Sequence, residues 1–270
     1  MKQYLDLVKK ILIQGEDRGD RTGIGTRALF GEKMIFDNVH SHFPAVTCKH
    51  LAFKPMAAEL YCFLQSYEFK AQFNAAGCKI WDGNIDAWNA QGWAGRIYGV
   101  QWRKWQSKYS VDSVDQIAEL IKTANARPTD RRLVVTAWNP GELTQMCLPP
   151  CHMFFQVYCR EPGILDLQVY LRSLDMMLGA PFDIASYALL MHILGRDLDR
   201  IPGTLTLVSG DTHIYKNHIS AAIEVINRRP LDLPHLVLSP ECRGVDSFLP
   251  EHATLNGYIS HPAVNFPLNV

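Results

Sequence analysis

A largely apolar run without proline reads DIASYALLMHILGRDL over residues 183–198. Its length and composition predict a helix that is buried over most of its surface. Three β-rich runs precede it, at residues 133–138, 153–158 and 165–171, and residues 204–208 form a fourth. These runs predict strands. Helices and strands mixed along one chain favour a domain of the α+β or α/β class.

The remaining patterns extend this prediction towards both ends of the chain. Apolar residues at helical spacing predict amphipathic helices over residues 5–12 and 114–121. Pro55 suits the first turn of a helix that continues to Leu64, and residues 29–36 read as a strand. Residues 82–110 predict a long functional loop, and the segment after Asp211 is expected to turn helical. Because no repeat or linker interrupts the pattern, residues 1–270 are expected to form a single domain.

Composition narrows the class of protein. The chain has 270 residues, of which 47% are hydrophobic, and a formal net charge of zero, so bulk nucleic-acid binding has no electrostatic support. The first residues are charged, and no apolar run approaches the roughly 20 residues that span a bilayer, so neither a signal peptide nor a membrane anchor is expected. Seven cysteines form no Cys-x-x-Cys pair, which predicts no metal site, no disulfide framework and a reducing, cytoplasmic location.

The segment Pro149-Pro150-Cys151-His152 places a cysteine at the entry to a predicted strand. Two prolines fix the backbone there, which suits a precisely aimed side chain and favours Cys151 as a nucleophile. The alternative is a buried structural cysteine. A Cys–His protease dyad is disfavoured, because neighbours on a strand point to opposite faces and His152 is poorly placed to deprotonate Cys151.

Four arginines are candidates to activate the cysteine and to bind a phosphate. Arg131 and Arg132 precede one strand, Arg172 ends another, and Arg21 lies in a glycine-bearing loop. Guanidinium groups bind phosphate oxygens well, and cations lower the pKa of a thiol. Each arginine alone would be interpreted as a surface charge. Together with the run Asp211-Thr212-His213-Ile214-Tyr215, which offers partners for sugar hydroxyls, they predict a nucleoside monophosphate site.

These motifs carry a resemblance to a known family. From end to end the chain resembles the thymidylate synthases, and the matching segments follow the family's order. They are Asp20-Arg21-Thr22-Gly23, Ile80-Trp81-Asp82, Tyr98-Gly99-Val100-Gln101-Trp102-Arg103, Arg131-Arg132, Pro149-Pro150-Cys151-His152, Arg172-Ser173, Gly210-Asp211-Thr212-His213-Ile214-Tyr215, and the tail from His261-Pro262 to Val270. The resemblance implies a large, mixed, twisted β-sheet flanked by helices, and a homodimer that forms through the sheet.

The resemblance also implies a reaction and a set of nucleotide contacts. Cys151 would attack C6 of a pyrimidine and make C5 nucleophilic, and C5 would take a one-carbon unit from 5,10-methylenetetrahydrofolate without a metal. The implied phosphate ligands are Arg21, Arg172 and the pair Arg131 and Arg132, which a partner subunit would contribute. Ser173, His213 and Tyr215 are implied to complete nucleotide binding, with the last two on the deoxyribose 3′-hydroxyl.

Further roles follow from the same resemblance. Glu59, Tyr98 and His152 would organise water and proton transfer around C4 and C5. The residues implied to line the folate pocket, with the last one helping to close it, are Trp81, Asp175, Leu178, Gly179, Phe182 and Val270. A structural ion pair would also explain Glu59, and Trp81 and Phe182 would also serve as ordinary core aromatics.

Asp183 departs from the family pattern, since thymidylate synthases carry there the asparagine that reads uracil. An ionised carboxylate accepts hydrogen bonds and cannot donate to O4 of uracil. It can accept from the exocyclic amino group of cytosine, and a protonated carboxyl could also donate to N3. Phage deoxycytidylate hydroxymethylases are similar in having aspartate at this place. We therefore expect dCMP as the substrate; the alternative is an enzyme that still uses dUMP.

The product depends on the folate side of the site. Hydride from tetrahydrofolate would give a methyl group, whereas water would give a hydroxymethyl group, so methylation requires water to be excluded. Trp81 and the full-length tail resemble the methyl-forming enzymes and favour 5-methyl-dCMP, with 5-hydroxymethyl-dCMP as the alternative. A catalytically inactive nucleotide- or RNA-binding homologue is a further alternative. A dedicated dCMP enzyme would suit a phage that modifies its DNA and would then act in the host cytoplasm.

Overall fold

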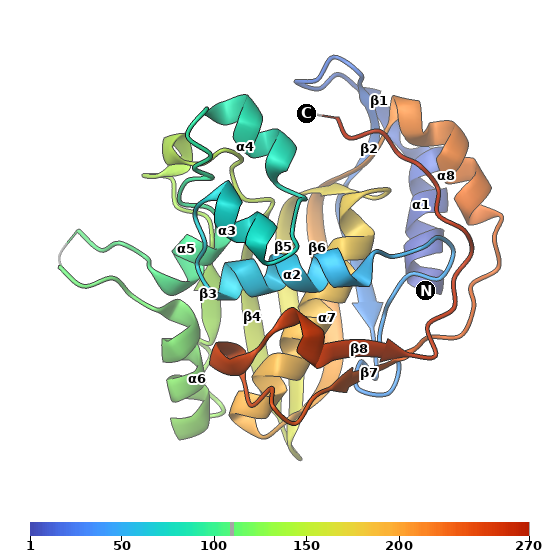
Figure 1. Ribbon diagram of the computed structural model, residues 1–270. Coiled ribbons are helices and arrows are strands. Elements are labelled where there is room, and N and C mark those ends of the chain that lie inside the picture. The colour runs from blue at the N-terminus through green and yellow to red at the C-terminus, as the bar shows by residue number, and fades with distance from the viewer. Residues whose placement is uncertain (109–110, 270) are drawn as a thin grey trace.

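A six-stranded mixed sheet forms the centre of the protein (Figure 1), in a computed structural model that describes residues 1–108 and 111–269. The strand order is β1-β2-β6-β5-β4-β3, and only β5 and β6 run parallel. The strands are β1 (Glu16–Arg18), β2 (Thr26–Phe36), β3 (Val134–Thr136), β4 (His152–Arg160), β5 (Ile164–Asp175) and β6 (Ile201–Tyr215). The mixed α+β fold and the large sheet predicted from the sequence are confirmed.

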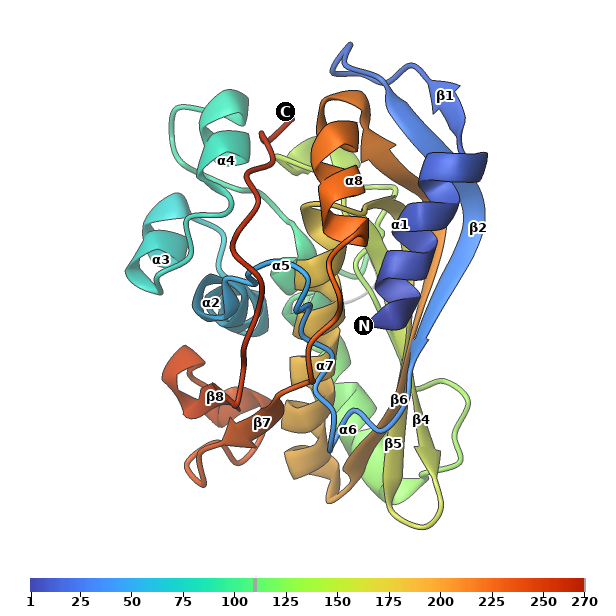
Figure 2. The same cartoon turned by 90° about the vertical axis from the view of Figure 1, so that its right-hand side faces the viewer.

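Helices gather on one face of this sheet, which Figure 2 shows nearly edge-on. They are α1 (Lys2–Gln14), α2 (Phe53–Leu64), α3 (Lys70–Ala75), α4 (Asp82–Trp88), α5 (Tyr98–Arg103), α6 (Gln116–Ala126), α7 (Gly179–Leu198) and α8 (Ile219–Ile226). A separate antiparallel pair, β7 (His235–Leu238) and β8 (Ala253–Asn256), lies below α2 in Figure 1. The main apolar core extends from α1 through α7 to Phe266 near the C-terminus.

The predicted apolar helix is α7, and it connects the two parallel strands. Parallel neighbours cannot be joined by a hairpin, so the chain must cross over between β5 and β6. The crossover helix packs against both strands and against α2, and Ile184, Leu189 and Ile193 are completely buried. The helix starts at Gly179, four residues before the predicted start, since Pro181 fits a first helical turn. Asp183 therefore lies inside the helix, near its N-terminus.

Two predictions about local structure are wrong. Residues 82–110 include α4 and α5 instead of forming one long loop. These helices have seven and six residues, which is too short for a 3.6-residue period to be visible in the sequence. The chain also stays extended after Asp211, because β6 pairs with β2 and β5 on its two sides as far as Tyr215 and His213. The helical segment begins only after Tyr215.

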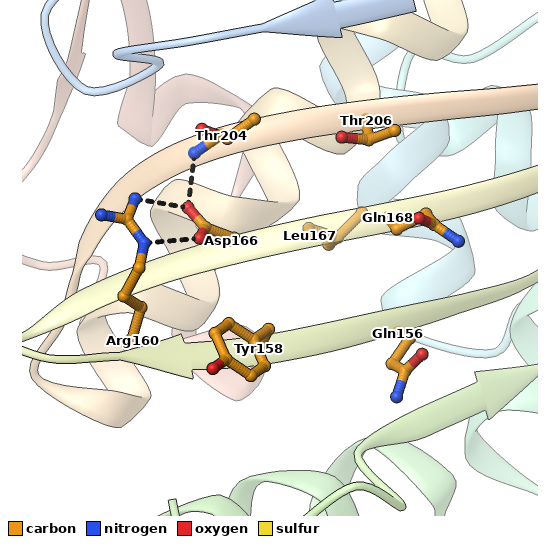
Figure 3. Close-up of a pocket in the computed structure, with 8 residues that line it drawn as sticks. All are labelled: Gln156, Tyr158, Arg160, Asp166, Leu167, Gln168, Thr204 and Thr206. Carbon is orange, nitrogen blue, oxygen red and sulfur yellow. Dashed lines mark hydrogen bonds and ion pairs between the residues drawn. The ribbon is translucent and has the colours of Figure 1, made fainter. Parts of the chain in front are cut away.

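The face of the sheet opposite α7 carries a shallow hollow of about 450 Å³ (Figure 3). Along β4 the side chains alternate, so Phe155 and Val157 are buried under the helices while Tyr158 points outward and is 64% exposed. Phe30 of β2 is 77% exposed. The residues that line the hollow are Gln156, Tyr158, Arg160, Asp166, Leu167, Gln168, Thr204 and Thr206. This face combines aromatic and polar groups without a covering helix.

Close packing of α5 on α2 predicts a large effect of a small substitution. A Cβ atom on Gly99 would lie 2.3 Å from the Phe63 carbonyl oxygen, so Gly99→Ala must push two helices apart. We expect a loss of about 3 kcal/mol in the free energy of unfolding, measured by urea denaturation. Gly19→Ala is the control, because nothing lies within 4 Å of the added atom. Equal stability of the two variants would contradict the tight contact.

Candidate active site

The predicted nucleophile lies where β4 and β5 meet the helices. Cys151 directly precedes β4, and its backbone N–H donates to the Tyr98 hydroxyl at 2.7 Å. Its Sγ lies 3.9 Å from Nη2 of Arg172, which is on β5. Burial raises the pKa of the Cys151 thiol, and the positive charge of Arg172 opposes this shift. A nearby guanidinium favours the thiolate form, which is the form that attacks carbon.

Arg172 is held in place by the two prolines before the cysteine. Its Nε donates to the Pro150 carbonyl and its Nη2 to the Pro149 carbonyl, each at 2.9 Å. The guanidinium also lies over the Trp138 ring, 5.6 Å from its centroid. The double proline thus orients the arginine as well as the cysteine.

His152 points away from the thiol and binds Asp183. Its Nε2 lies 2.7 Å from Oδ1 of Asp183, and its ring packs between Tyr98 and Tyr187 at centroid distances of 5.0 and 5.4 Å. Burial lowers the pKa of His152, but the charge of Asp183 and the hydrogen bond to it raise that pKa to a net value above the usual one. The structure therefore agrees with the expectation that His152 does not deprotonate Cys151.

Glu59 of α2 contributes a second carboxyl group to the same region. Its Oε1 accepts a hydrogen bond of 2.8 Å from Nε1 of Trp81. Burial raises the pKa of Glu59 to about 7, although the charge of His152 and the Trp81 hydrogen bond both lower it. A carboxyl group with this pKa can hold or release a proton near neutrality, as a general acid or base requires. Trp81 has a defined polar partner in addition to its aromatic contacts with Phe63 and Tyr98.

Replacing Glu59 with Gln is expected to make stability less dependent on pH. Between pH 4.5 and about 7 this carboxyl is protonated in the folded protein and ionised in the unfolded chain, so its contribution to stability falls as pH rises through that window. Glutamine does not titrate. The stability of Glu59→Gln relative to the unaltered protein should therefore increase by about 2 kcal/mol between roughly pH 5.5 and pH 7.5. Urea denaturation at both pH values measures this; a constant difference would contradict the raised pKa.

The end of β6 presents the predicted sugar-binding residues. Nδ1 of His213 lies 2.8 Å from Oδ1 of Asp211, and the His213 ring contacts Tyr215 edge-on. Ser173 of β5 lies beside Asp211 in the parallel register. The aligned strand ends bring these side chains to one edge of the sheet, next to Arg172.

The loop that carries Arg21 is ordered by Asp20. The Asp20 carboxylate accepts hydrogen bonds from the Thr22 hydroxyl at 2.6 Å and from the Gly25 backbone at 2.8 Å. Gly23 and Gly25 have positive φ values of 76° and 79°, which glycine adopts without strain. Arg21 itself is exposed, and its charge lowers the pKa of Cys151, although burial dominates there. The loop thus places the Arg21 charge close enough to act on the thiol.

Arg131 and Arg132 lie apart from this cluster. Arg132 forms a two-point ion pair with Asp130, at 3.0 and 2.9 Å, and its side chain is 81% exposed. The Arg131 carbonyl accepts a hydrogen bond from Gln156 on the open face of the sheet. Within residues 1–108 and 111–269, neither arginine forms an ion pair or hydrogen bond with the residues around Cys151.

Four of the residues predicted for the folate pocket lie at the start of α7, whereas Trp81 precedes α4 and contacts Glu59. Oδ1 of Asp175 accepts backbone hydrogen bonds from Met177 at 2.8 Å and Leu178 at 3.2 Å, which shapes the turn into the helix. Gly179 opens α7, and Leu178 and Phe182 are partly buried beside it. An apolar, partly open surface next to a carboxylate fits a flat heterocycle that carries hydrogen-bond donors. Val270 lies outside the described residues.

Several polar groups near the site were not identified from the sequence. Lys49 is buried and donates a 2.6 Å hydrogen bond to the Met177 carbonyl, and burial lowers its pKa to about 8. His218 binds the Pro267 carbonyl through Nε2, at 2.9 Å, and its ring contacts Phe266 in the tail. The ring of Tyr187 packs against the ring of His152. Of these groups, only Tyr187 could have been identified from the sequence, since it lies one helical turn after Asp183.

The described part of the chain contains neither a metal-binding group nor a membrane-spanning helix. In residues 1–108 and 111–269, no group of three or more His, Cys, Asp or Glu side chains is arranged to hold a metal ion. No helix in those residues is long and apolar enough to cross a membrane.

Comparison with known proteins places these features in a family. Residues 2–270 match the family model described as thymidylate synthase. The chain is also similar to a protein of Enterobacteria phage T4 that is named thymidylate synthase. The two are 42% identical over an alignment of 288 positions, which covers 98% of this chain and 98% of the phage protein. These matches span every site residue described above.

Proposed function

Since this chain belongs to the thymidylate synthase family, whose reaction is methyl transfer from 5,10-methylenetetrahydrofolate to C5 of a pyrimidine nucleotide, we propose that its nucleotide is dCMP. The product of this reaction is 5-methyl-dCMP. The observation that carries the proposal is the carboxyl group of Asp183, which lies in the cluster of Cys151 and is hydrogen-bonded to His152.

Asp183 favours cytosine because of its donor and acceptor pattern. An amide at this place can donate to O4 of uracil and accept from N3–H. A carboxylate cannot donate, so it would face O4 with a second acceptor. The same carboxylate accepts from the 4-amino group of cytosine, and when protonated it donates to N3. A site that hydrogen-bonds one base in this way rejects the other by a large factor, because buried polar groups are left unpaired.

The other residues around the thiol support covalent catalysis. Cys151 adds through Sγ to C6, and Arg172 stabilises the thiolate before attack. Glu59 holds or takes up a proton near the base, as its pKa of about 7 allows. Tyr98 holds the backbone of Cys151 through its hydroxyl oxygen. The thiolate is thus aimed by contacts on both its backbone and its side chain.

Nucleotide binding uses the edge formed by β5, β6 and the Arg21 loop. Arg21 and Arg172 bind the phosphate, Ser173 contributes a hydroxyl beside them, and His213 and Tyr215 bind the 3′-hydroxyl of deoxyribose. The Asp211 carboxylate orients the His213 ring. This arrangement gives the phosphate and the base opposite ends of the cluster around Cys151.

The co-substrate would lie against Trp81, Leu178, Gly179 and Phe182, with Asp175 as its polar contact and Val270 closing the pocket. When bound, methylenetetrahydrofolate supplies the one-carbon unit and the hydride that turns it into a methyl group. The residues of this chain exclude water, since Trp81 is almost completely buried and its indole is fixed by Glu59. This favours methylation, and 5-hydroxymethyl-dCMP is the second candidate product.

The open face of the sheet supports a homodimer in which Arg131 and Arg132 complete the partner's phosphate site. That face exposes Phe30 and Tyr158, and Phe154 stacks on Tyr170 beside them. Apolar aromatic area that no helix covers is typical of an interface between subunits. The Arg132 side chain is exposed and pairs with Asp130, so it is available to a partner subunit.

Mixing two inactive variants tests the shared site. Cys151→Ala lacks the nucleophile, and Arg132→Glu lacks the phosphate contact that it would give to its partner. Refolded together, they form mixed dimers in which one site has both groups intact, so activity should return to roughly a quarter of the normal level, as random pairing predicts. The two variants refolded separately are the controls. Failure of the mixture to recover activity would contradict the contribution across the interface.

A product analysis tests the proposed substrate. The protein is incubated with methylenetetrahydrofolate and either dCMP or dUMP tritiated at C5, and tritium release, dihydrofolate absorbance and the mass of the nucleotide are measured. We expect tritium release from dCMP, formation of dihydrofolate and a mass gain of one methyl group. Release from dUMP alone would overturn the dCMP assignment, release from neither would favour an inactive binding homologue, and a hydroxymethyl product without dihydrofolate would overturn methylation.

We further propose that residues 1–270 act as one catalytic domain in the cytoplasm, in line with seven cysteines that are all free. A role in modifying the DNA of a phage, in the host cytoplasm, follows from a dedicated dCMP enzyme.

A further inference from the structure

The proposed base-reading carboxyl has a polar side-chain partner that is itself enclosed. Asp183 extends from α7 and meets Nε2 of His152 from β4 at 2.7 Å. Rings of Tyr98 and Tyr187 cover the imidazole on two sides. Because only about 15% of the His152 side chain and 14% of the Asp183 side chain are exposed, water has little access to the bond between them.

The charges around this pair favour one shared proton. Glu59 from α2 faces both members, Tyr98 from α5 and Tyr187 from α7 face Asp183, and Cys151 lies at the start of β4. Arg172 from β5 faces Cys151. Burial lowers the pKa of His152, yet the charges of Asp183 and Glu59 raise it to a net value above the usual one. The charges of Asp183 and Glu59 thus favour a proton on His152, at the atom that faces Asp183.

When a thiolate adds to C6, cytosine needs a proton on N3, whereas uracil does not. Addition of a thiolate to C6 of cytosine leaves an electron pair on N3, whereas in uracil the pair moves to O4. Asp183 is proposed to face N3, and a carboxylate can hand a proton to N3 only after it has received one. The histidine beside it can supply that proton.

We propose that His152 delivers, through Asp183, the proton that cytosine N3 takes up when Cys151 adds to C6. The inference rests on the proposed dCMP specificity and adds a source for the proton. His152 acts through Asp183 and has no direct part in the attack by the thiolate.

The step balances as follows. The thiolate electron pair forms the Sγ–C6 bond, the C5=C6 pair becomes C4=C5, and the N3=C4 pair becomes a lone pair on N3. The His152 imidazolium passes its proton to the Asp183 carboxylate, and N3 takes that proton from the resulting carboxyl group, which leaves a neutral imidazole beside the carboxylate. The enamine carbon C5 is then nucleophilic. When the Sγ–C6 bond breaks at the end of the reaction, the electron pairs return and N3 gives its proton back to the pair.

The test compares His152→Gln in two backgrounds. Glutamine can donate a hydrogen bond to Asp183 and hold it in place, but it cannot deliver a proton. With dCMP, we expect His152→Gln to lower kcat about 100-fold with little change in KM, and to move the basic limb of the pH profile to lower pH. In the Asp183→Asn background, assayed with dUMP, the same substitution should lower kcat by a clearly smaller factor, about 10-fold or less.

Each outcome separates one explanation from the others. Equal losses in both backgrounds would assign His152 a structural role and overturn the relay, as would an unchanged kcat and pH profile with dCMP. His192→Asn is the matched control, because this partly buried histidine of α7 binds the Val39 carbonyl and lies outside the cluster. Unaltered protein that releases tritium from dUMP but not from dCMP would show that the proposed function itself has failed.

A second measurement keeps the proposal testable if His152→Gln does not fold. The basic limb in kcat/KM that a relay requires should be present for dCMP with the unaltered protein and absent for dUMP with Asp183→Asn. The same limb in both would overturn the relay.

Discussion

Cys151→Ala is expected to lose at least about 10⁵-fold in turnover, because no other group in the cluster can form the bond to C6. Tritium release from C5 of the nucleotide measures the loss directly, since that exchange depends on the covalent adduct. Binding of dCMP, measured by calorimetry, should remain, as the arginines and the β6 residues are untouched. A variant that keeps more than about a hundredth of the activity would contradict nucleophilic catalysis by this thiol.

Cys147→Ala is the matched control for that loss. Cys147 lies four residues before Cys151 and is also only partly buried. Burial raises its pKa to about 11, and no cation opposes this shift. Its thiol thus stays protonated at neutral pH, and its removal should leave turnover within about 3-fold of normal. The contrast between the two cysteines isolates the contribution of Arg172 and the double proline.

Asp183→Asn is expected to reverse the choice of base. The amide can donate a hydrogen bond to O4 of uracil but cannot transfer a proton to N3 of cytosine, so kcat/KM should fall for dCMP and rise for dUMP. We expect the ratio of the two constants to change by about 10³-fold or more. Parallel tritium-release assays with the two nucleotides measure that ratio, and an unchanged ratio would defeat the base-reading argument.

Asp183→Glu is the control that separates the charge of the carboxyl group from its position. It keeps the carboxyl group but moves it by one methylene, so the bond to His152 and the contact with the base cannot both be kept. We expect loss of activity on dCMP without any gain on dUMP. A gain on dUMP would indicate that the shape of the pocket, and not the amide, selects uracil.

The sequence was most informative where long patterns of one type occur. The apolar run of α7 and the β-rich runs of β4 and β5 predicted a buried helix and two strands, since each of these elements is long enough to show its composition. Short helices such as α4 and α5 left no period to detect. The extension of β6 to Tyr215 depends on pairing with β2 and β5, and that information lies far away in the chain.

The candidate site was likewise predictable only in part. Residue types and family order identified Cys151, Arg172 and Asp183, because the chemistry needs those groups. Which side chains touch could not be predicted, as it depends on how α7 packs against β4. The contact between His152 and Asp183 and the hydrogen bond from Trp81 to Glu59 both arise from that packing. Trp81 was expected as a wall of the folate pocket or as an ordinary core aromatic, and not as a hydrogen-bond donor to Glu59.

The pairing of β2 with β6 has a consequence for how the protein is made. The register joins Thr26 to Tyr215, and β6 fills the space between β2 and β5. A ribosome therefore releases α1 and β2 long before their sheet partner exists, and only a late segment can join the two ends. Nascent chains stopped before Tyr215 should lack both the complete six-stranded sheet and the sugar-binding edge. Their apolar surfaces should therefore depend on chaperones until synthesis is nearly complete.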